Sequence, residues 1–399
     1  MRVTHVITRL VVGGAQENTV SSVLGLSKIP GVRCDLVSGP THGPEGSLEN
    51  AFASKPDQLR ICPPLVRPIS PSRDFAAYRE LKALFRHEKP DIVHTHSGKA
   101  GIVGRLAARH AGVPVVIHTI HGPSFGPFQG RLANTVFTAA ERWAGRATGH
   151  FVVVADAMRD QYLAAGIGRR DDYTCIRSGF DLQPFLEATN DPALRAKLGL
   201  KPEDFVIGKI ARLFELKGHD DLFAIAPELV RRIPHAKFLF VGDGIWRGRF
   251  EQMAKDLGLS DHFVFTGLVP PSDVAKHVGV MDVLAHLSRR EGLPRAIPQA
   301  LAAGKPVVAF DCDGAREVCL HGKTGILLAP GDLRGLTESL AGLAEDPGLR
   351  RRLGEAGRAL VREQFTVEAM VAGLHRLYEK LLPKRCGGNP KTEGQSPKE

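Results

Sequence analysis

The chain has 399 residues, 43% of them hydrophobic, with 53 Lys and Arg against 43 Asp and Glu and a formal net charge of +10. This length can bury a large core and suggests two domains, while no apolar run reaches the roughly 18–20 residues that a membrane-spanning helix needs. The N-terminus does not have the pattern of a signal peptide, and six scattered cysteines without a C-x-x-C pair favour free thiols in a reducing cytoplasm.

The first predicted unit is a short strand at residues 3–7, a turn at Gly13 and Gly14, and a helix that continues to about Leu26. A tight Gly-Gly turn at the start of a helix lets the backbone approach a ligand closely, although many α/β proteins use such a turn for packing alone. Residues 40–72 are rich in proline, so we expect irregular structure there with a short strand near residues 59–62.

A basic amphipathic helix is predicted over residues 74–87. Its apolar residues recur at helical spacing and its basic residues lie opposite or beside them. An ordinary surface helix with a solvated charged face is favoured over a membrane-contact face. The apolar set is Phe75, Tyr78, Leu81 and Phe85, and the basic set is Arg73, Arg79, Lys82 and Arg86.

Four histidines lie near the ends of the next two predicted strands, which begin at Asp91 and at Pro114; they are His94, His96, His118 and His121. Ligands of open α/β sheets bind beyond the carboxyl ends of the strands, so these histidines are candidates for a site. For any one of them, a structural hydrogen-bonded role is equally consistent. No carboxylate joins them at ligand spacing, so we predict no metal site.

The pattern restarts with a predicted strand at residues 205–210, after which Arg212 and Lys217 flank one strand-to-helix turn. Both cations can point at the same anion, and a bidentate guanidinium with a mobile ammonium suits a diphosphate. Two solvent-exposed charges are the alternative. A strand at residues 237–241 then ends at Gly242, and a strand at residues 263–267 is followed by Leu268 and Val269.

An acidic residue, Glu291, lies in a turn with Gly292, Leu293 and Pro294, before a helix-like run at residues 295–303. Because Pro298 has no N–H to donate, it fits only the first helical turn, so the helix should begin near Pro294. Free N–H groups at a helix start suit a phosphate, and a carboxylate beside them suits a sugar hydroxyl.

These motifs resemble the retaining glycosyltransferases of the GT-B fold, in particular glycosyltransferase family 4 (glycosyl transferases group 1). The family signature is EGLP…EA-A-G-PVVA…G…E…G, in which a second Glu follows the first after seven residues; here that position is Gln299. The run at Arg212–Gly218 is similar to the family's G-R-L-x-x-x-K-G diphosphate clamp. The histidines are similar to its H-x-H and H-T-x-H-G motifs, and Gly13–Glu17 to its GGAE loop.

The resemblance implies an α/β protein with two Rossmann-like, doubly wound parallel-sheet domains that face an interdomain cleft. Residues 1–183 would form the acceptor-side domain and residues 184–365 the nucleotide-sugar-binding domain. Residues 366–383 would form a helix that crosses back to the first domain. Residues 384–399 are polar and predict a disordered tail.

The resemblance also assigns roles to residues. His121, Glu291, Arg212 and Lys217 would be catalytic, with Glu291 on the sugar hydroxyls and the two cations on the diphosphate. Gln299, two helical turns deeper, would meet the ribose. The remaining donor contacts would be Gly13, Gly14, Gly242, Leu268, Val269, Gly292, Leu293 and Pro294.

The expected function is retaining transfer of a sugar from a nucleoside-diphosphate sugar, with a UDP-sugar favoured, to a glycan or lipid-linked glycan. The reaction should need neither metal nor cofactor. A non-catalytic nucleotide-sugar-binding partner remains open because the second Glu is replaced. A GT-B-like epimerase is less favoured, because we find no placed acid and base carboxylates for it.

The positive charge is concentrated in the first half, where residues 1–183 hold 22 Lys and Arg against 15 Asp and Glu. A basic first domain suits an anionic acceptor or an anionic membrane surface, so a cytoplasmic protein attached to the inner face of a membrane is an option. Basic and aromatic residues are not interleaved and no recognition motif is present, so nucleic acid is not an expected partner.

Overall fold

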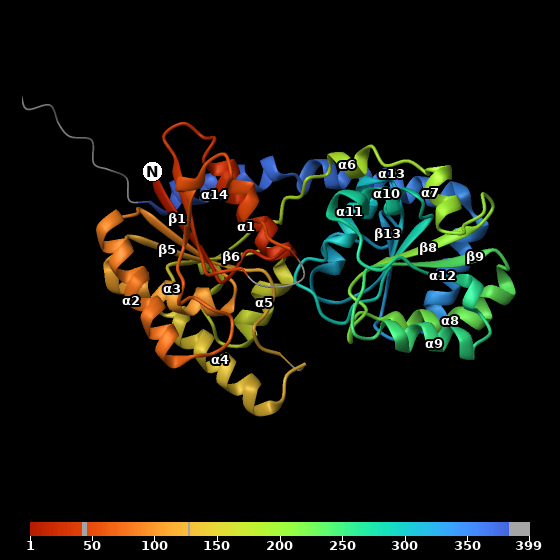
Figure 1. Cartoon of the computed structure of the whole chain (residues 1–399), viewed down its shortest axis with the longest axis horizontal. Helices are drawn as coiled ribbons and strands as arrows, with labels where there is room; N and C mark the ends of the chain where they lie inside the picture. The colour runs from red at the N-terminus through yellow and green to blue at the C-terminus, as the bar shows by residue number, and fades with distance from the viewer. Residues whose placement is uncertain (42–45, 127, 383–399) are drawn as a thin grey trace, which may run out of the picture.

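The computed structural model describes residues 1–41, 46–126 and 128–382. The chain forms two α/β lobes side by side, each around one fully parallel sheet (Figure 1). The first sheet has seven strands in the order β3-β2-β1-β4-β5-β6-β7, and the second has six in the order β10-β9-β8-β11-β12-β13. The predicted pair of Rossmann-like domains is confirmed.

The first lobe contains strands β1 to β7 and helices α1 to α5. Its strands are β1 (Arg2–Ile7), β2 (Arg33–Ser38), β3 (Leu59–Ile61), β4 (Ile92–His96), β5 (Val115–Ile120), β6 (His150–Val153) and β7 (Tyr173–Cys175). Its helices are α1 (Gly14–Leu26), α2 (Pro71–Glu88), α3 (Gly98–Ala111), α4 (Arg131–Gly145) and α5 (Asp156–Ala164).

The second lobe begins with α6 (Gln183–Leu186) and α7 (Pro192–Lys197). Its strands are β8 (Phe205–Ile210), β9 (Ala236–Val241), β10 (Phe263–Phe265), β11 (Val283–His286), β12 (Val307–Phe310) and β13 (Gly325–Leu328). Its helices are α8 (His219–Arg232), α9 (Arg247–Asp256), α10 (Val274–Gly279), α11 (Ala296–Ala302), α12 (Leu333–Glu345) and α13 (Pro347–Gln364), and α14 (Val367–Leu381) follows.

Helices cover both faces of each sheet, so the inner strands are buried on both sides and read as continuous apolar runs such as β12, VVAF. In the first lobe the contact is tight. A Cβ added at Gly101 of α3 would come within 2.5 Å of the His118 ring on β5. A side chain at that position would push the helix away from the sheet.

Helix α14 crosses from the second lobe to the first, where it packs beside α1 (Figure 1). Met370, Leu374 and Tyr378 of α14 belong to the same buried cluster as Val20 and Val23 of α1. The two interlobe segments meet at Phe180, whose N–H donates to the carbonyl of Phe365 at 2.9 Å. The predicted tail, residues 384–399, lies outside the described residues.

Four expectations from the sequence concern these elements and the cysteines. The predicted helix after Glu291 starts at Ala296 rather than near Pro294, with Pro298 in its first turn, because residues 291–294 form an irregular turn. The predicted surface helix is α2, in which Leu81 and Phe85 are buried while Phe75 is exposed. All cysteines of the described residues are free thiols. Within the described part of the chain, no helix is long and apolar enough to cross a membrane.

Candidate active site

The turn between β11 and α11 lies against the first lobe. A Cβ added at Gly292 would lie 1.8 Å from the carbonyl oxygen of His121, which follows β5. The other side of the turn is held by the second lobe, where the Gly314 N–H donates to the Gly292 carbonyl at 3.0 Å. Only a glycine fits at position 292, and the fit brings the predicted residues His121 and Gly292 together between the lobes.

Glu291, which directly precedes Gly292 in this turn, is held by three contacts. Lys217 Nζ donates to its Oε1 at 2.5 Å, His286 Nε2 lies 4.0 Å from the same oxygen, and its backbone N–H donates to Asp313 Oδ2 at 2.7 Å. Burial alone would raise the pKa of Glu291, but the neighbouring Lys217 and His286 outweigh it and hold the pKa below the usual value. Glu291 is therefore a fixed carboxylate at neutral pH.

The two predicted cations occupy different environments. Lys217 is half-buried against Glu291, whereas Arg212 is exposed, with its guanidinium carbon 5.9 Å from the centre of the Phe214 ring. Arg212 forms no ion pair within the described residues. The turn that carries both cations ends at Gly218 (φ 71°), where a Cβ would lie 2.1 Å from the Leu287 carbonyl oxygen. That approach fixes Lys217 beside the end of β11.

The turn at Gly13 and Gly14 is connected to the same region by helix α1, which follows it. Gly14 is the first residue of α1, and Gly13 before it has an extended backbone (φ 175°). Glu17, in the first turn of α1, forms an ion pair with Arg295 across the lobes. Sequence reasoning gave neither partner a role, because a pair 278 residues apart leaves no local signal. The ion pair links the glycine turn to the start of α11.

The remaining predicted donor residues line the second lobe. Gly242 (φ 136°) approaches the backbone so closely that a Cβ would lie 2.3 Å from the Ala211 carbonyl oxygen. Leu268 is exposed and Val269 half-buried after β10. Leu293 is half-buried and Pro294 is buried in the turn. Gln299 is buried in α11, and its side chain forms no hydrogen bond within the described residues.

A stack of buried histidines lies behind His121. His96 Nδ1 is 3.0 Å from His121 Nε2, and His96 Nε2 is 2.8 Å from His5 Nδ1. His94 stacks on His96 with ring centroids 4.6 Å apart. His118 is outside this stack and bonds Thr95 Oγ1 at 2.9 Å. The sequence analysis missed His5, which enters because β1 pairs with β4 in a register that sets it beside His94.

These histidines predict an acid-sensitive fold. Burial lowers the pKa of His5 to about 3 and that of His121 to about 4, whereas in the unfolded chain both should be about 6.5. The unfolded state therefore binds more protons below about pH 6.5, and each histidine removes up to about 1.4 kcal/mol of stability per pH unit until its folded pKa is reached. The unfolding temperature should fall steadily from pH 7 to pH 5.

Matched variants identify the source of that fall. His5→Asn should give a shallower dependence of the unfolding temperature on pH, and His235→Asn, at an exposed position, should leave the slope unchanged. Equal slopes in both variants would contradict the assignment to the buried histidines. Calorimetry at half-unit pH steps is the measurement.

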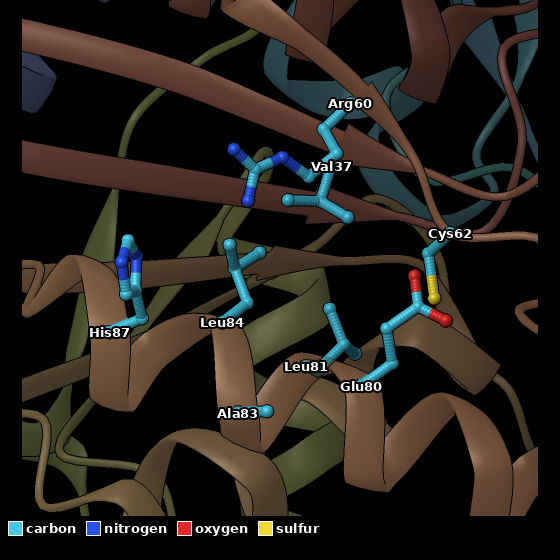
Figure 2. Close-up of a pocket in the computed structure, with 8 residues that line it drawn as sticks. All are labelled: Val37, Arg60, Cys62, Glu80, Leu81, Ala83, Leu84 and His87. Atoms are coloured by element: carbon cyan, nitrogen blue, oxygen red, sulfur yellow. The ribbon is translucent and has the colours of Figure 1, made fainter.

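A surface groove between β3 and α2 is separate from this site (Figure 2). It is lined by Arg60, Cys62, Glu80, Leu84 and His87, among others, on the side of the first lobe that faces away from the second (Figures 1 and 2). None of the predicted site residues lines it. The candidate active site is the region between the lobes instead.

Comparison with known proteins identifies the family. The chain matches the family model "Glycosyltransferase Family 4" over residues 12–184 and "Glycosyl transferases group 1" over residues 190–360. It is 30% identical to a UDP-Gal:alpha-D-GlcNAc-diphosphoundecaprenol alpha-1,3-galactosyltransferase of Escherichia coli, over 71% of this chain and 74% of that protein. It is also 30% identical to a GDP-mannose-dependent alpha-(1-6)-phosphatidylinositol monomannoside mannosyltransferase of Mycolicibacterium smegmatis, over the same shares.

The fold agrees with solved structures. Anabaena Alr3699/HepE in complex with UDP superimposes with a TM-score of 0.80 at 22% identity, covering 95% of this chain and all of that one. A sucrose-phosphate synthase from Thermosynechococcus elongatus gives a TM-score of 0.77 at 19% identity, covering 96% and 99% of the two chains. The chain therefore belongs to the family 4 glycosyltransferases of the GT-B fold.

Proposed function

We propose that this glycosyltransferase moves a sugar from a UDP-sugar to a lipid-linked glycan, with retention of configuration at the anomeric carbon. The observation that carries the proposal is the ion pair between Lys217 and Glu291. Glu291 lies in the turn between β11 and α11, and this turn contacts the first lobe at His121. A cation for the diphosphate, a carboxylate for the sugar hydroxyls and a histidine from the opposite lobe meet in one region.

Charge stabilisation supports a reaction without a metal or other cofactor. As the glycosidic bond breaks, negative charge develops on the leaving diphosphate. Lys217 lies at the site, and Arg212 has no ion-pair partner in the described structure, so it can turn toward the leaving group. Preorganised donors aimed at developing charge are an effective form of transition-state stabilisation.

The choice of UDP is supported by relatives. The Escherichia coli relative uses UDP-Gal, and Anabaena HepE binds UDP and UDP-glucose, whereas the Mycolicibacterium smegmatis relative uses GDP-mannose. Both named bacterial acceptors, a diphosphoundecaprenol-linked sugar and a phosphatidylinositol mannoside, are lipid-linked. These relatives favour a lipid-linked acceptor for this chain too.

The direct test incubates the protein with UDP-, GDP- and ADP-sugars and a lipid-linked acceptor, and follows the anomeric carbon by NMR. A new glycosidic bond with the donor's configuration is the expected result with a UDP-sugar. An inverted bond would refute retention. An epimerised donor would identify an epimerase, and binding without turnover would identify a non-catalytic partner.

The surface of α4 supports an acceptor at an anionic membrane. Leu132, Val136 and Trp143 are 79%, 56% and 55% exposed, and with the exposed Ala139 they recur at i, i+4, i+7 and i+11 along the helix. This spacing gathers them into one stripe, which we call the α4 stripe. Arg131 and Arg142 lie along one side of it. An apolar stripe with a basic flank suits an anionic lipid surface.

Leu132→Ser/Trp143→Ser should weaken binding to liposomes that contain anionic lipid at least about tenfold, since each buried apolar side chain contributes about 1.5–3 kcal/mol. Co-sedimentation with these liposomes at low salt measures the binding. Ile245→Ser is the matched control, because Ile245 is equally exposed but lies on the second lobe. Loss of binding in the control, or no binding by the wild type, would contradict a role for the α4 stripe.

Gln299→Glu tests the residue that departs from the family signature. A carboxylate would add charge assistance to a ribose hydrogen bond, which is worth about 1 kcal/mol more than a neutral one. The ribose does not change during the reaction, so donor KM should fall by about fivefold while kcat stays similar. Steady-state kinetics on the wild type and on Gln299→Glu measures donor KM and kcat. Turnover by Gln299→Glu alone would make the natural chain a degenerate binding partner.

A further inference from the structure

A continuous chain of hydrogen bonds connects the cleft to the crossing helix α14. From His121 it passes His96 and His5 and reaches Tyr378 of α14, whose hydroxyl lies 3.2 Å from His5 Nε2. The same hydroxyl lies 2.5 Å from His94 Nδ1, and His94 Nε2 lies 2.6 Å from Thr119 Oγ1. We call this set the histidine wire: His121, His96, His5, Tyr378, His94 and Thr119.

The imidazoles of the histidine wire are neutral. Burial lowers the pKa of His94 and His96 well below the ordinary value, as it does for His5 and His121. Within the described structure, no salt bridge reaches any of these four rings. A neutral imidazole has one N–H donor and one lone pair, so each ring donates on one side and accepts on the other.

This rule makes the histidine wire directional. If one member donates toward its neighbour, that neighbour must donate to the next, and the direction at one end therefore fixes every tautomer along it. Two arrangements exist. In one, all four rings carry the proton on Nε2; in the other, all four carry it on Nδ1.

Thr119 selects between these two arrangements of the ring protons. Thr119 is 3% exposed, and the only hydrogen-bond partner of its hydroxyl within the described residues is His94 Nε2. If Thr119 accepted from His94, its own proton would be buried without an acceptor among these residues, which is the costly case for a polar group. Thr119 therefore donates to His94, and His94 donates from Nδ1 to Tyr378.

The direction then follows to the cleft. Tyr378 donates to His5 Nε2, His5 Nδ1 donates to His96 Nε2, and His96 Nδ1 donates to His121 Nε2. His121 keeps its proton on Nδ1, which has no partner in the described part of the chain and remains free for a ligand. Free histidine in water prefers the opposite, Nε2–H tautomer.

The hydrogen bonds of the histidine wire also argue against a metal ion among its histidines. His5, His94 and His96 have ligand atoms within 4.8 Å of one another, a spacing that resembles a metal site. In the histidine wire, however, the lone pair of each ring already accepts a hydrogen bond. A metal would have to break three of these bonds in a fully buried place.

We propose that Thr119 and Tyr378 are positioning residues that hold His121 as its Nδ1–H tautomer, so that the cleft is offered a fixed hydrogen-bond donor for an oxygen of the bound sugar. The ligand and the kinetic consequence rest on the proposed function; the tautomer does not. Tyr378 thereby couples the crossing helix to the site.

The test uses protein labelled with ¹⁵N in its histidine rings, because protonated and unprotonated ring nitrogens resonate in separate ranges. The His121 signals, assigned by their loss in His121→Gln, should show protonated Nδ1 in the wild type. Tyr378→Phe and Thr119→Val should each give a mixture with the Nε2–H form. Tyr173→Phe removes another buried tyrosine hydroxyl, which bonds the Ile167 carbonyl, and should leave His121 unchanged.

Kinetics supplies the second readout. The kcat/KM for the donor in Tyr378→Phe and Thr119→Val should fall about two- to tenfold, in proportion to the fraction of His121 left as Nδ1–H, because only that tautomer offers the hydrogen bond to the bound sugar. A wild-type His121 with protonated Nε2, a tautomer that neither variant changes, or unchanged kcat/KM with a mixed tautomer would each overturn the proposal. If no donor is turned over by the wild type, the proposed function fails, and the ring spectra alone decide the wire.

Discussion

Lys217→Ala should lower kcat for glycosyl transfer by roughly 10²–10³-fold, the usual cost of removing one donor that stabilises charge in the transition state. The Lys217 ammonium is held 2.5 Å from Glu291 Oε1 in the turn between the lobes. It is therefore placed before the donor binds and needs little reorganisation during the reaction. Steady-state kinetics with the identified donor measures the loss.

Glu291→Gln should also lower kcat severely, because the amide keeps the size of the side chain but loses its charge. Since Lys217 and Glu291 form one pair, the double variant should lose much less than the sum of the two single losses. Arg212→Ala should likewise be far from additive with Lys217→Ala, if both cations act on one diphosphate.

A matched control separates the site from general charge effects. Lys276→Ala removes a lysine that forms an exposed ion pair with Asp273 on the second lobe, and it should keep the wild-type rate. Near-wild-type activity in Lys217→Ala would remove Lys217 from the mechanism. Full kcat in Glu291→Gln would overturn the site as a whole.

The second large effect concerns the stability of the first lobe. Arg105 of α3 and Glu141 of α4 form a fully buried ion pair, with Nη2 to Oε2 at 2.8 Å. The guanidinium also donates from Nε to the Gly101 carbonyl at 2.7 Å. Arg105→Met leaves the Glu141 carboxylate buried without its cation, and Glu141→Gln leaves the guanidinium without its anion. Either change should cost about 3–5 kcal/mol.

Hydrogen exchange of the β5 amides, which lie in the same lobe, measures this loss without assuming that both lobes unfold together. The control is Glu338→Gln, which breaks the exposed pair with Arg232 on the second lobe and should have no measurable effect. If Arg105→Met and Glu141→Gln are as stable as the wild type, the pair does not hold α3 to α4. The double variant Arg105→Met/Glu141→Met should recover part of the loss, because it removes both buried charges.

The fold was predictable because its signals are local. Short apolar strands, glycine turns and amphipathic helices recur in order, and two such series predict two doubly wound domains. The same holds for the turn around Glu291, although the helix after it starts at Ala296. The α4 stripe could also have been predicted from its helical spacing. The more basic helix α2 was considered as a membrane-contact helix instead.

The long-range partners were not predictable. Lys217 and Glu291 were each assigned to the donor, but their bond to each other depends on β8 and β11 being neighbours in the sheet. His5 joins the other histidines only because β1 lies beside β4, and Tyr378 only because α14 returns to the first lobe. Strand order and the path of a crossing helix are set by the packing of the whole chain.

The return of α14 has a consequence for biosynthesis. The buried cluster of the first lobe includes Met370, Leu374 and Tyr378, which follow the whole second lobe in the chain. At about 5–20 residues per second, a ribosome needs roughly 10–40 s to make residues 184–369. During that time α1 has no α14 to cover it, because the second lobe is still being made. The lobe that is translated first is therefore completed last, and a chaperone that covers the exposed face of α1 would act in this interval.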